Sequence, residues 1–235
     1  MLESAPLMGE NAIRDNLQRV QAVIAGACAR AGRKPDEVLL IAVSKTVEIE
    51  RIRLSVAAGV AALGENRVQE AKEKIEALGR PVPWHLIGAL QTNKAKDAAR
   101  LFDWVHSVDR HELAQELDRR ARALGRTVDA LLEVNVGEEP QKSGARPGEI
   151  KGLLDACSRF ASLRIRGLMA IPPAADDPEQ TRPYFRRLRE LRDAAGLEHL
   201  SMGMSADFAV AVEEGATMVR VGTAIFGPRP PRVSA

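Results

Sequence analysis

The feature that most restricts the fold of this chain is a regular alternation of apolar, strand-like runs with helix-like segments. Helical periodicity fills the stretches between the runs, from residues 47–58 to residues 206–214. Such alternation is typical of a parallel sheet, and eight repeats fit a closed (β/α)8 TIM barrel of the α/β class. The eight strand-like runs are residues 38–45, 62–66, 83–90, 104–108, 129–136, 163–171, 199–204 and 218–222.

The main alternative is an open, doubly wound sheet, but no convincing GxGxxG turn follows the first strand to favour it. An extra helix precedes that strand, and it ends before Gly32 and Pro35. Its apolar face is made of Ile13, Leu17, Val20, Ile24 and Cys28. Because prolines crowd the chain after residue 227, a helix after the last strand is nearly missing. We therefore hypothesise that the N-terminal helix covers that gap.

Length and composition predict one domain without nucleic-acid or membrane partners. We expect a loose extension over 1–9, a single barrel over 10–227 and a Pro-rich tail over 228–235. A net charge of +2 and 3% aromatic residues argue against nucleic-acid binding. The chain shows neither a signal peptide nor a membrane-spanning stretch, so we expect a cytoplasmic protein. The two cysteines, Cys28 and Cys157, are interpreted as small core residues, and no metal site is predicted.

The strongest candidate for chemistry is Lys45, which ends the first strand-like run. A lysine next to a buried strand loses hydration unless it is paired or neutralised. A desolvated lysine amine can form a Schiff base with a carbonyl compound. Because barrel active sites lie at the carboxyl ends of strands, Lys45 is expected at the site.

The ends of the last two strands predict a phosphate cradle. Ser205 is expected to open a short helix, where a hydroxyl and free N–H groups favour an anion. Gly222 and Thr223 offer unobstructed N–H groups and a second hydroxyl. A Schiff-base lysine and a phosphate cradle in one barrel suggest pyridoxal 5′-phosphate (PLP).

Several segments together resemble the YggS/PROSC family of PLP homeostasis proteins, over about residues 10 to 227. They are residues 42–46 (AVSKT), 64–66 (GEN), 84–88 (WHLIG), 142–144 (KSG), 167–172 (GLMAIP), 200–205 (LSMGMS) and 219–227 (VRVGTAIFG). The resemblance implies a barrel like the N-terminal domain of alanine racemase, with PLP as cofactor. It also implies a function as carrier or buffer in vitamin B6 homeostasis, with PLP-requiring apo-enzymes as possible partners.

Residue by residue, Lys45 matches the PLP lysine of the family. Its phosphate contacts are matched by Ser205, Gly222 and Thr223, and Ser201 belongs to the same predicted cofactor site. Asn66 matches a residue beside the cofactor, and Arg220 matches the arginine that faces the pyridine nitrogen. No residue is assigned a catalytic role.

Arg220 also has a chemical consequence of its own. Strand alternation turns its side chain away from the side of Val219 and Val221, towards the barrel interior. A permanently charged arginine disfavours protonation of the ring nitrogen, which makes PLP a weaker electron sink. Reversible exchange at the aldehyde stays easy, whereas transamination and decarboxylation become less favourable.

Two alternatives stay open at this stage. One is a weak racemase that uses Lys45 as its one base. A tyrosine as second base is not available, since the only tyrosine, Tyr184, lies in a helix placed outside the barrel. The other is an aldolase that uses Lys45 on a phosphorylated sugar. Lys142 is either a second amine for PLP or a loop charge, and His85 is interpreted as a hydrogen-bonded core residue. A monomer is expected, because no second domain completes a shared site.

Overall fold

The structure is a computed structural model that describes residues 9–228. Its eight strands pair in parallel and in sequence order, and the last pairs with the first to close the barrel. The predicted fold is therefore confirmed, and the open-sheet alternative is wrong. The strands are β1 (Leu39–Val43), β2 (Ala62–Glu65), β3 (Trp84–Leu86), β4 (Trp104–Val108), β5 (Val128–Glu133), β6 (Leu163–Met169), β7 (His199–Ser201) and β8 (Met218–Val221).

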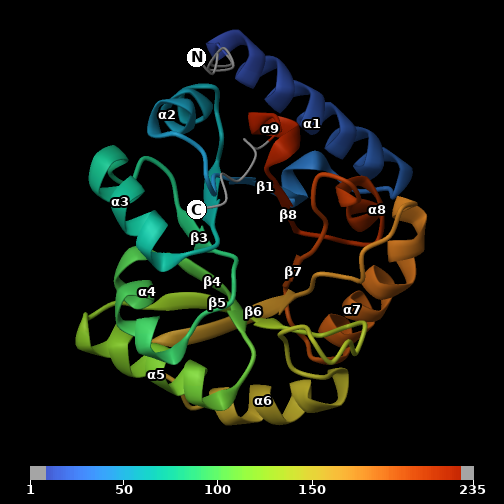
Figure 1. Ribbon diagram of the computed structural model, residues 1–235. Helices are drawn as coiled ribbons and strands as arrows, with labels where there is room; N and C mark the ends of the chain where they lie inside the picture. Colours follow the sequence, from blue (N-terminus) through green and yellow to red (C-terminus); the bar gives the residue numbers. More distant parts are fainter. Residues whose placement is uncertain (1–8, 229–235) are drawn as a thin grey trace.

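Helices surround the strands in a ring (Figure 1). The segments with helical periodicity therefore form helices that bury one face against the sheet. The helices are α1 (Glu10–Arg30), α2 (Ile49–Ala57), α3 (Val68–Leu78), α4 (Ala95–Leu101), α5 (His111–Ala123), α6 (Ile150–Cys157), α7 (Arg182–Ala194), α8 (Phe208–Glu213) and α9 (Thr223–Phe226).

The first helix covers the side of the barrel that the last repeat leaves open. After β8 the chain forms only α9, a single turn of four residues. In Figure 1, α1 (blue) lies along α9 and α8 (red), and residue contacts join it to both. The side-chain amide of Asn16 donates to the carbonyl of Ile225 at 2.9 Å. These contacts confirm the hypothesis that the N-terminal helix fills the gap.

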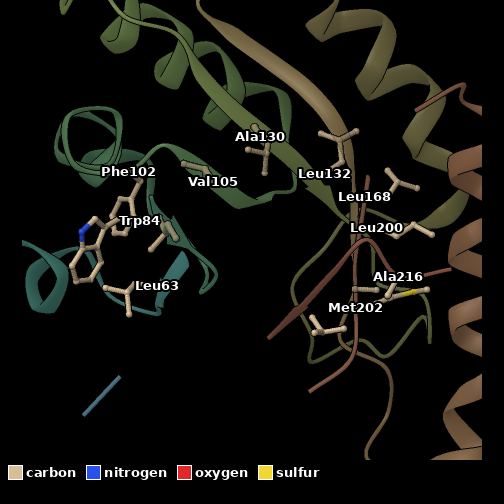
Figure 2. Packing of buried hydrophobic residues seen from close by; sticks show 14 of the residues in the cluster. Leu63, Trp84, Phe102, Val105, Ala130, Leu132, Leu168, Leu200, Met202 and Ala216 are labelled. Carbon is tan, nitrogen blue, oxygen red and sulfur yellow. The ribbon is translucent and has the colours of Figure 1, made fainter. Parts of the chain in front are cut away.

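The core has two layers, because alternate residues of each strand face opposite sides of the barrel wall. The larger layer lies between strands and helices, and Figure 2 shows part of it, including Leu63, Trp84, Phe102, Leu132 and Leu168. The smaller layer fills the barrel itself. It consists of Ile41, Ala62, Leu131, Met169 and Met218.

Several element boundaries differ from the sequence-based expectation. The first strand ends at Val43, so Lys45 stands two residues beyond it in a turn. The helix expected from residue 206 begins at Phe208, because a turn occupies residues 205–207. Of the predicted terminal segments, residues 1–8 and 229–235 lie outside the described residues. Within the described part of the chain, no helix is long and apolar enough to cross a membrane.

Candidate functional site

A cavity of about 300 Å³ opens at the carboxyl ends of the strands. Six of the predicted site residues line it: Lys45, Asn66, Ser205, Arg220, Gly222 and Thr223. A larger cavity of about 440 Å³ lies between α1 and the start of β1, and mostly aliphatic side chains line it. Chemistry favours the smaller cavity, because only there do an amine, a guanidinium and two hydroxyl groups converge.

The sheet register brings Lys45 and its neighbours together. Val43 of β1 pairs with Gly64 of β2, so the turns that carry Lys45 and Asn66 leave the barrel side by side. Lys45 is half-buried. The next residue, Thr46, has a φ of 61°, which is a left-handed conformation that a β-branched residue rarely adopts. Surrounding contacts must hold this turn in place.

A buried ammonium group from α3 supplies those contacts. Lys74 Nζ donates to the carbonyl of Ser44 at 2.6 Å, to Glu65 Oε1 at 2.7 Å and to Glu70 Oε1 at 2.7 Å. Glu70 Oε1 in turn accepts from the N–H of Thr46 at 2.5 Å. The residues on both sides of Lys45 are thus bound to one ion cluster, which we call the Lys74 cluster (Ser44, Thr46, Glu65, Glu70 and Lys74).

Burial and charge oppose each other within the Lys74 cluster. Burial is the largest influence on Glu65 and raises its pKa, although the charge of Lys74 and hydrogen bonds from Lys74 and Ser44 act against it. For Glu70 burial also raises the pKa, but hydrogen bonds from Lys74 and Thr46 outweigh it and the pKa falls. Sequence reasoning missed this cluster. The available signals were the Glu70–Lys74 spacing on one helix face and a glutamate in a buried strand.

Arg220 forms the deep end of the cavity. The residue is 3% exposed and lines the cavity, whereas Val219 and Val221 pack in the layer between strands and helices, which confirms the prediction that Arg220 points into the barrel. Nη1 donates to Ser201 Oγ at 2.7 Å, and Nη2 donates to the carbonyl of Ala170 at 3.0 Å. Burial lowers the pKa of Arg220 to about 10, while Asp207 and Glu133 act to raise it. The guanidinium therefore stays charged at neutral pH.

Ser201 is the one predicted site residue that does not line this cavity. It lies fully buried and contacts Arg220 instead. Ser201 can therefore influence a ligand in the cavity only through Arg220, which it contacts and which lines the cavity.

The turn that carries Ser205 depends on a glycine. Gly203 has a φ of 89°, and an added Cβ would lie 2.5 Å from the Cβ of Ala211 and 2.9 Å from the Cα of Phe208. Asp207 closes the turn by accepting from the N–H of Met204 at 2.7 Å. The sequence suggested that Ser205 opens a helix, but Ser205 lies in a turn before α8, which begins at Phe208.

Both phosphate-cradle segments that line the cavity carry main-chain N–H groups without an acceptor among the described residues. The N–H groups of Ser205, Ala206, Gly222 and Thr223 have no acceptor among residues 9–228. At Gly222 an added Cβ would lie 3.3 Å from the carbonyl oxygen of Val43, so a side chain there would crowd the wall. Unpaired N–H groups beside two hydroxyls form a site for an anion such as a phosphate.

A separate, neighbouring cavity contains Lys142. It measures about 280 Å³ and adjoins the first at Ile171, which lines both. Lys142 donates to the carbonyl of Pro172 at 2.9 Å and forms an ion pair with Glu139. The structure therefore does not place Lys142 among the residues around Lys45. Glu133, which sequence reasoning missed, lines this second cavity.

Glu133 is a buried carboxyl group without a partner for Oε2 among the described residues. Burial raises its pKa to about 7, and the charge of Asp109 acts in the same direction. Arg220 opposes the shift. The group is therefore close to half-protonated at neutral pH.

Comparison with known proteins places these features in context. Residues 10–230 match the family model of the alanine racemase N-terminal domain. The chain is 47% identical over 222 residues to the pyridoxal phosphate homeostasis protein of Aquifex aeolicus, covering 92% of this chain and 97% of the relative.

Two solved structures share the fold. PipY of Synechococcus elongatus, solved with PLP bound, is 39% identical, with 92% of this chain and 100% of that chain covered and a TM-score of 0.82. An alanine racemase of Clostridium difficile is 18% identical and has a TM-score of 0.74, with 95% of this chain and 58% of that chain covered. The second likeness concerns the fold alone.

Proposed function

We propose that this protein binds PLP in vitamin B6 homeostasis. The chain belongs to the alanine racemase N-terminal domain family and, within it, to the pyridoxal phosphate homeostasis proteins. Residues 10–227 act in this proposal as one PLP-binding domain. The protein holds PLP reversibly as a carrier or buffer, and apo-enzymes that require PLP are its proposed recipients. It acts as a monomer in the cytoplasm.

The observation that carries the proposal is the donor set of one cavity. A half-buried lysine amine, two hydroxyls, four unpaired N–H groups and a guanidinium surround about 300 Å³. PLP, when bound, supplies an aldehyde that reacts reversibly with a primary amine, together with a phosphate and a basic ring nitrogen. Amine, anion cradle and cationic donor are the three complementary groups, so the residues present fit the cofactor.

The roles of the residues follow from their positions. Lys45 is the proposed attachment point, and the Lys74 cluster holds the turn that carries it. Ser205, Gly222 and Thr223 bind the phosphate through hydroxyl and N–H groups, and Asn66 lines the wall. Arg220 provides a fixed positive charge at the deep end, which disfavours a second positive charge on the ring nitrogen.

The contacts of this chain favour binding over catalysis. Racemisation by two bases requires a second acid–base group opposite the lysine. The single tyrosine, Tyr184, lies on α7 in the outer ring of helices and packs against the core there. Relatives at 38–47% identity carry the name of homeostasis proteins. A slow one-base racemase that depends on Lys45 is the alternative for the assay below to exclude.

The test is covalent capture of PLP. Wild-type protein is mixed with PLP, its absorbance is recorded, and borohydride is added before the labelled peptide is identified. We expect the label on Lys45, none in Lys45→Ala, and unchanged labelling in Lys142→Ala, the matched variant from the neighbouring cavity. An unlabelled wild type, or a label on Lys142 alone, would overturn the assignment. Lys45-dependent formation of a D-amino acid from its L-enantiomer would favour the racemase.

A further inference from the structure

A chain of hydrogen bonds runs from Arg220 into the closed interior of the barrel. Arg220 Nη1 lies 2.7 Å from Ser201 Oγ, and Ser201 Oγ lies 2.9 Å from His106 Nδ1. His106 Nε2 then lies 2.9 Å from His85 Nδ1. The four side chains come from β8, β7, β4 and β3, and none is more than 3% exposed. The part formed by Ser201, His106 and His85 is therefore shielded from water, and Arg220 joins it to the cavity.

The direction of this chain follows from its first member. A guanidinium only donates, so Ser201 Oγ accepts from Arg220. The serine hydrogen then has one acceptor among the described residues, His106 Nδ1. A neutral His106 with a bare Nδ1 carries its hydrogen on Nε2 and donates it to His85 Nδ1, which leaves the hydrogen of His85 on Nε2. The opposite orientation would strand the buried serine hydrogen without a partner.

Both histidines are neutral for the same physical reason. Burial lowers the pKa of His85 to about 3, and Asp103 opposes this only in part. Burial also lowers the pKa of His106 far below its ordinary value, and His85, Arg220 and His199 add to the shift. The ring plane of His85 is fixed further, because it stacks on Trp104 with 5.7 Å between the ring centroids and 2° between the ring planes.

We propose that Ser201, His106 and His85 are positioning residues that act through Arg220. Ser201 binds one guanidinium nitrogen and the Ala170 carbonyl binds another, while His106 and His85 hold Ser201, so the Arg220 guanidinium is fixed where it lines the cavity. Because both histidines are neutral, they add no second positive charge beside Arg220. The inference rests on the proposed function in one respect, since the ligand that Arg220 meets is PLP.

The first test uses the protein without added PLP. The protein has four histidines, so nitrogen–proton spectra of the imidazole rings can be assigned by single substitutions. We expect His85 and His106 to carry hydrogen on Nε2 and to show no titration between about pH 5.5 and 8.5. Hydrogen on His106 Nδ1, or a titration of either ring near its ordinary pKa, would overturn the proposed chain.

The second test compares two substitutions of one histidine. His106→Asn keeps an acceptor at the position of Nδ1, whereas His106→Leu removes it and fills the space. We expect the PLP dissociation constant to rise about 10-fold or more in His106→Leu and Ser201→Ala, and to change less than about 3-fold in His106→Asn. Equal losses in the two His106 variants would show that packing, and not the hydrogen bond, matters, and would refute the positioning role.

These outcomes separate the inference from the proposed function. A wild-type protein that bound no PLP would refute the function and, with it, the role of the chain towards the ligand. The ring spectra would still decide the hydrogen-bond directions independently. A PLP-binding wild type with titrating histidines would refute the inference and leave the function intact.

Discussion

Replacing Lys74 by methionine tests how the turn around Lys45 is held. The side chain of Lys74 is 7% exposed, and its partner Glu65 is 0% exposed. Methionine preserves most of the volume but removes the ammonium group, so the buried Glu65 carboxylate keeps only the neutral Ser44 hydroxyl as a donor. Removing one partner of a buried ion pair costs about 3–5 kcal/mol. We expect a loss of about 3 kcal/mol at neutral pH, near the lower limit, because Glu65 can take up a proton.

The size of this loss depends on pH with a definite sign. Burial already raises the pKa of Glu65 above its ordinary value of 4.5, and losing Lys74 raises it further. The folded variant then binds more protons than the unfolded chain, so its free energy of unfolding falls as pH rises above about 4.5. The variant is expected to approach wild-type stability in mild acid and to be weakest above neutral pH.

Urea or thermal unfolding at several pH values measures the effect. A loss of about 3 kcal/mol corresponds to a melting temperature roughly 6–12 °C lower for a chain of this size. Lys72→Met is the matched control, because Lys72 lies on the same helix, is 40% exposed and pairs with Glu76 only at 4.0 Å. Its cost should stay below about 1 kcal/mol. A similarly small, pH-independent cost in Lys74→Met would refute the reasoning, whereas adding Glu65→Gln should restore part of the loss.

Three further predictions follow from single residues. Gly203→Ala places a Cβ 2.5 Å from that of Ala211 in a left-handed turn, so we expect a loss of about 2 kcal/mol or more and weaker PLP binding, measured by unfolding and absorbance titration; wild-type behaviour would contradict the required turn. Burial raises the pKa of Glu133 from 4.5 to about 7, so wild-type stability should fall as pH rises through that window, and Glu133→Gln should flatten the profile; parallel profiles would count against the shift. Burial raises the pKa of Cys157 to about 11, so a chromogenic disulfide should label it slowly at about pH 8 unless the protein is unfolded; rapid labelling of the folded protein would disprove its burial.

The order of elements could be predicted because it depends on local patterns. Apolar runs with helical segments between them define eight βα repeats, and closure into a barrel is the parallel arrangement that leaves no open edge. The inward direction of Arg220 followed from strand alternation in the same way, since side chains along a strand point to alternate faces. The prediction of an amine and an anion cradle in one site used only the rule that strand ends share one rim.

The groups that orient the site could not be predicted, because they lie far apart in the sequence. Ser201 and His106 are 95 positions apart, and only the register of the closed barrel brings them within hydrogen-bonding distance. In the sequence Lys74 is one of many charged residues on predicted helices, and only the packing of α3 brings it within hydrogen-bonding distance of Ser44. The sequence alone determined which strands form the barrel and which residues meet at its rim, because these depend on local periodicity. Tertiary structure decided which buried polar groups pair, because that depends on strand register and helix packing, which the periodicity of a single segment does not specify.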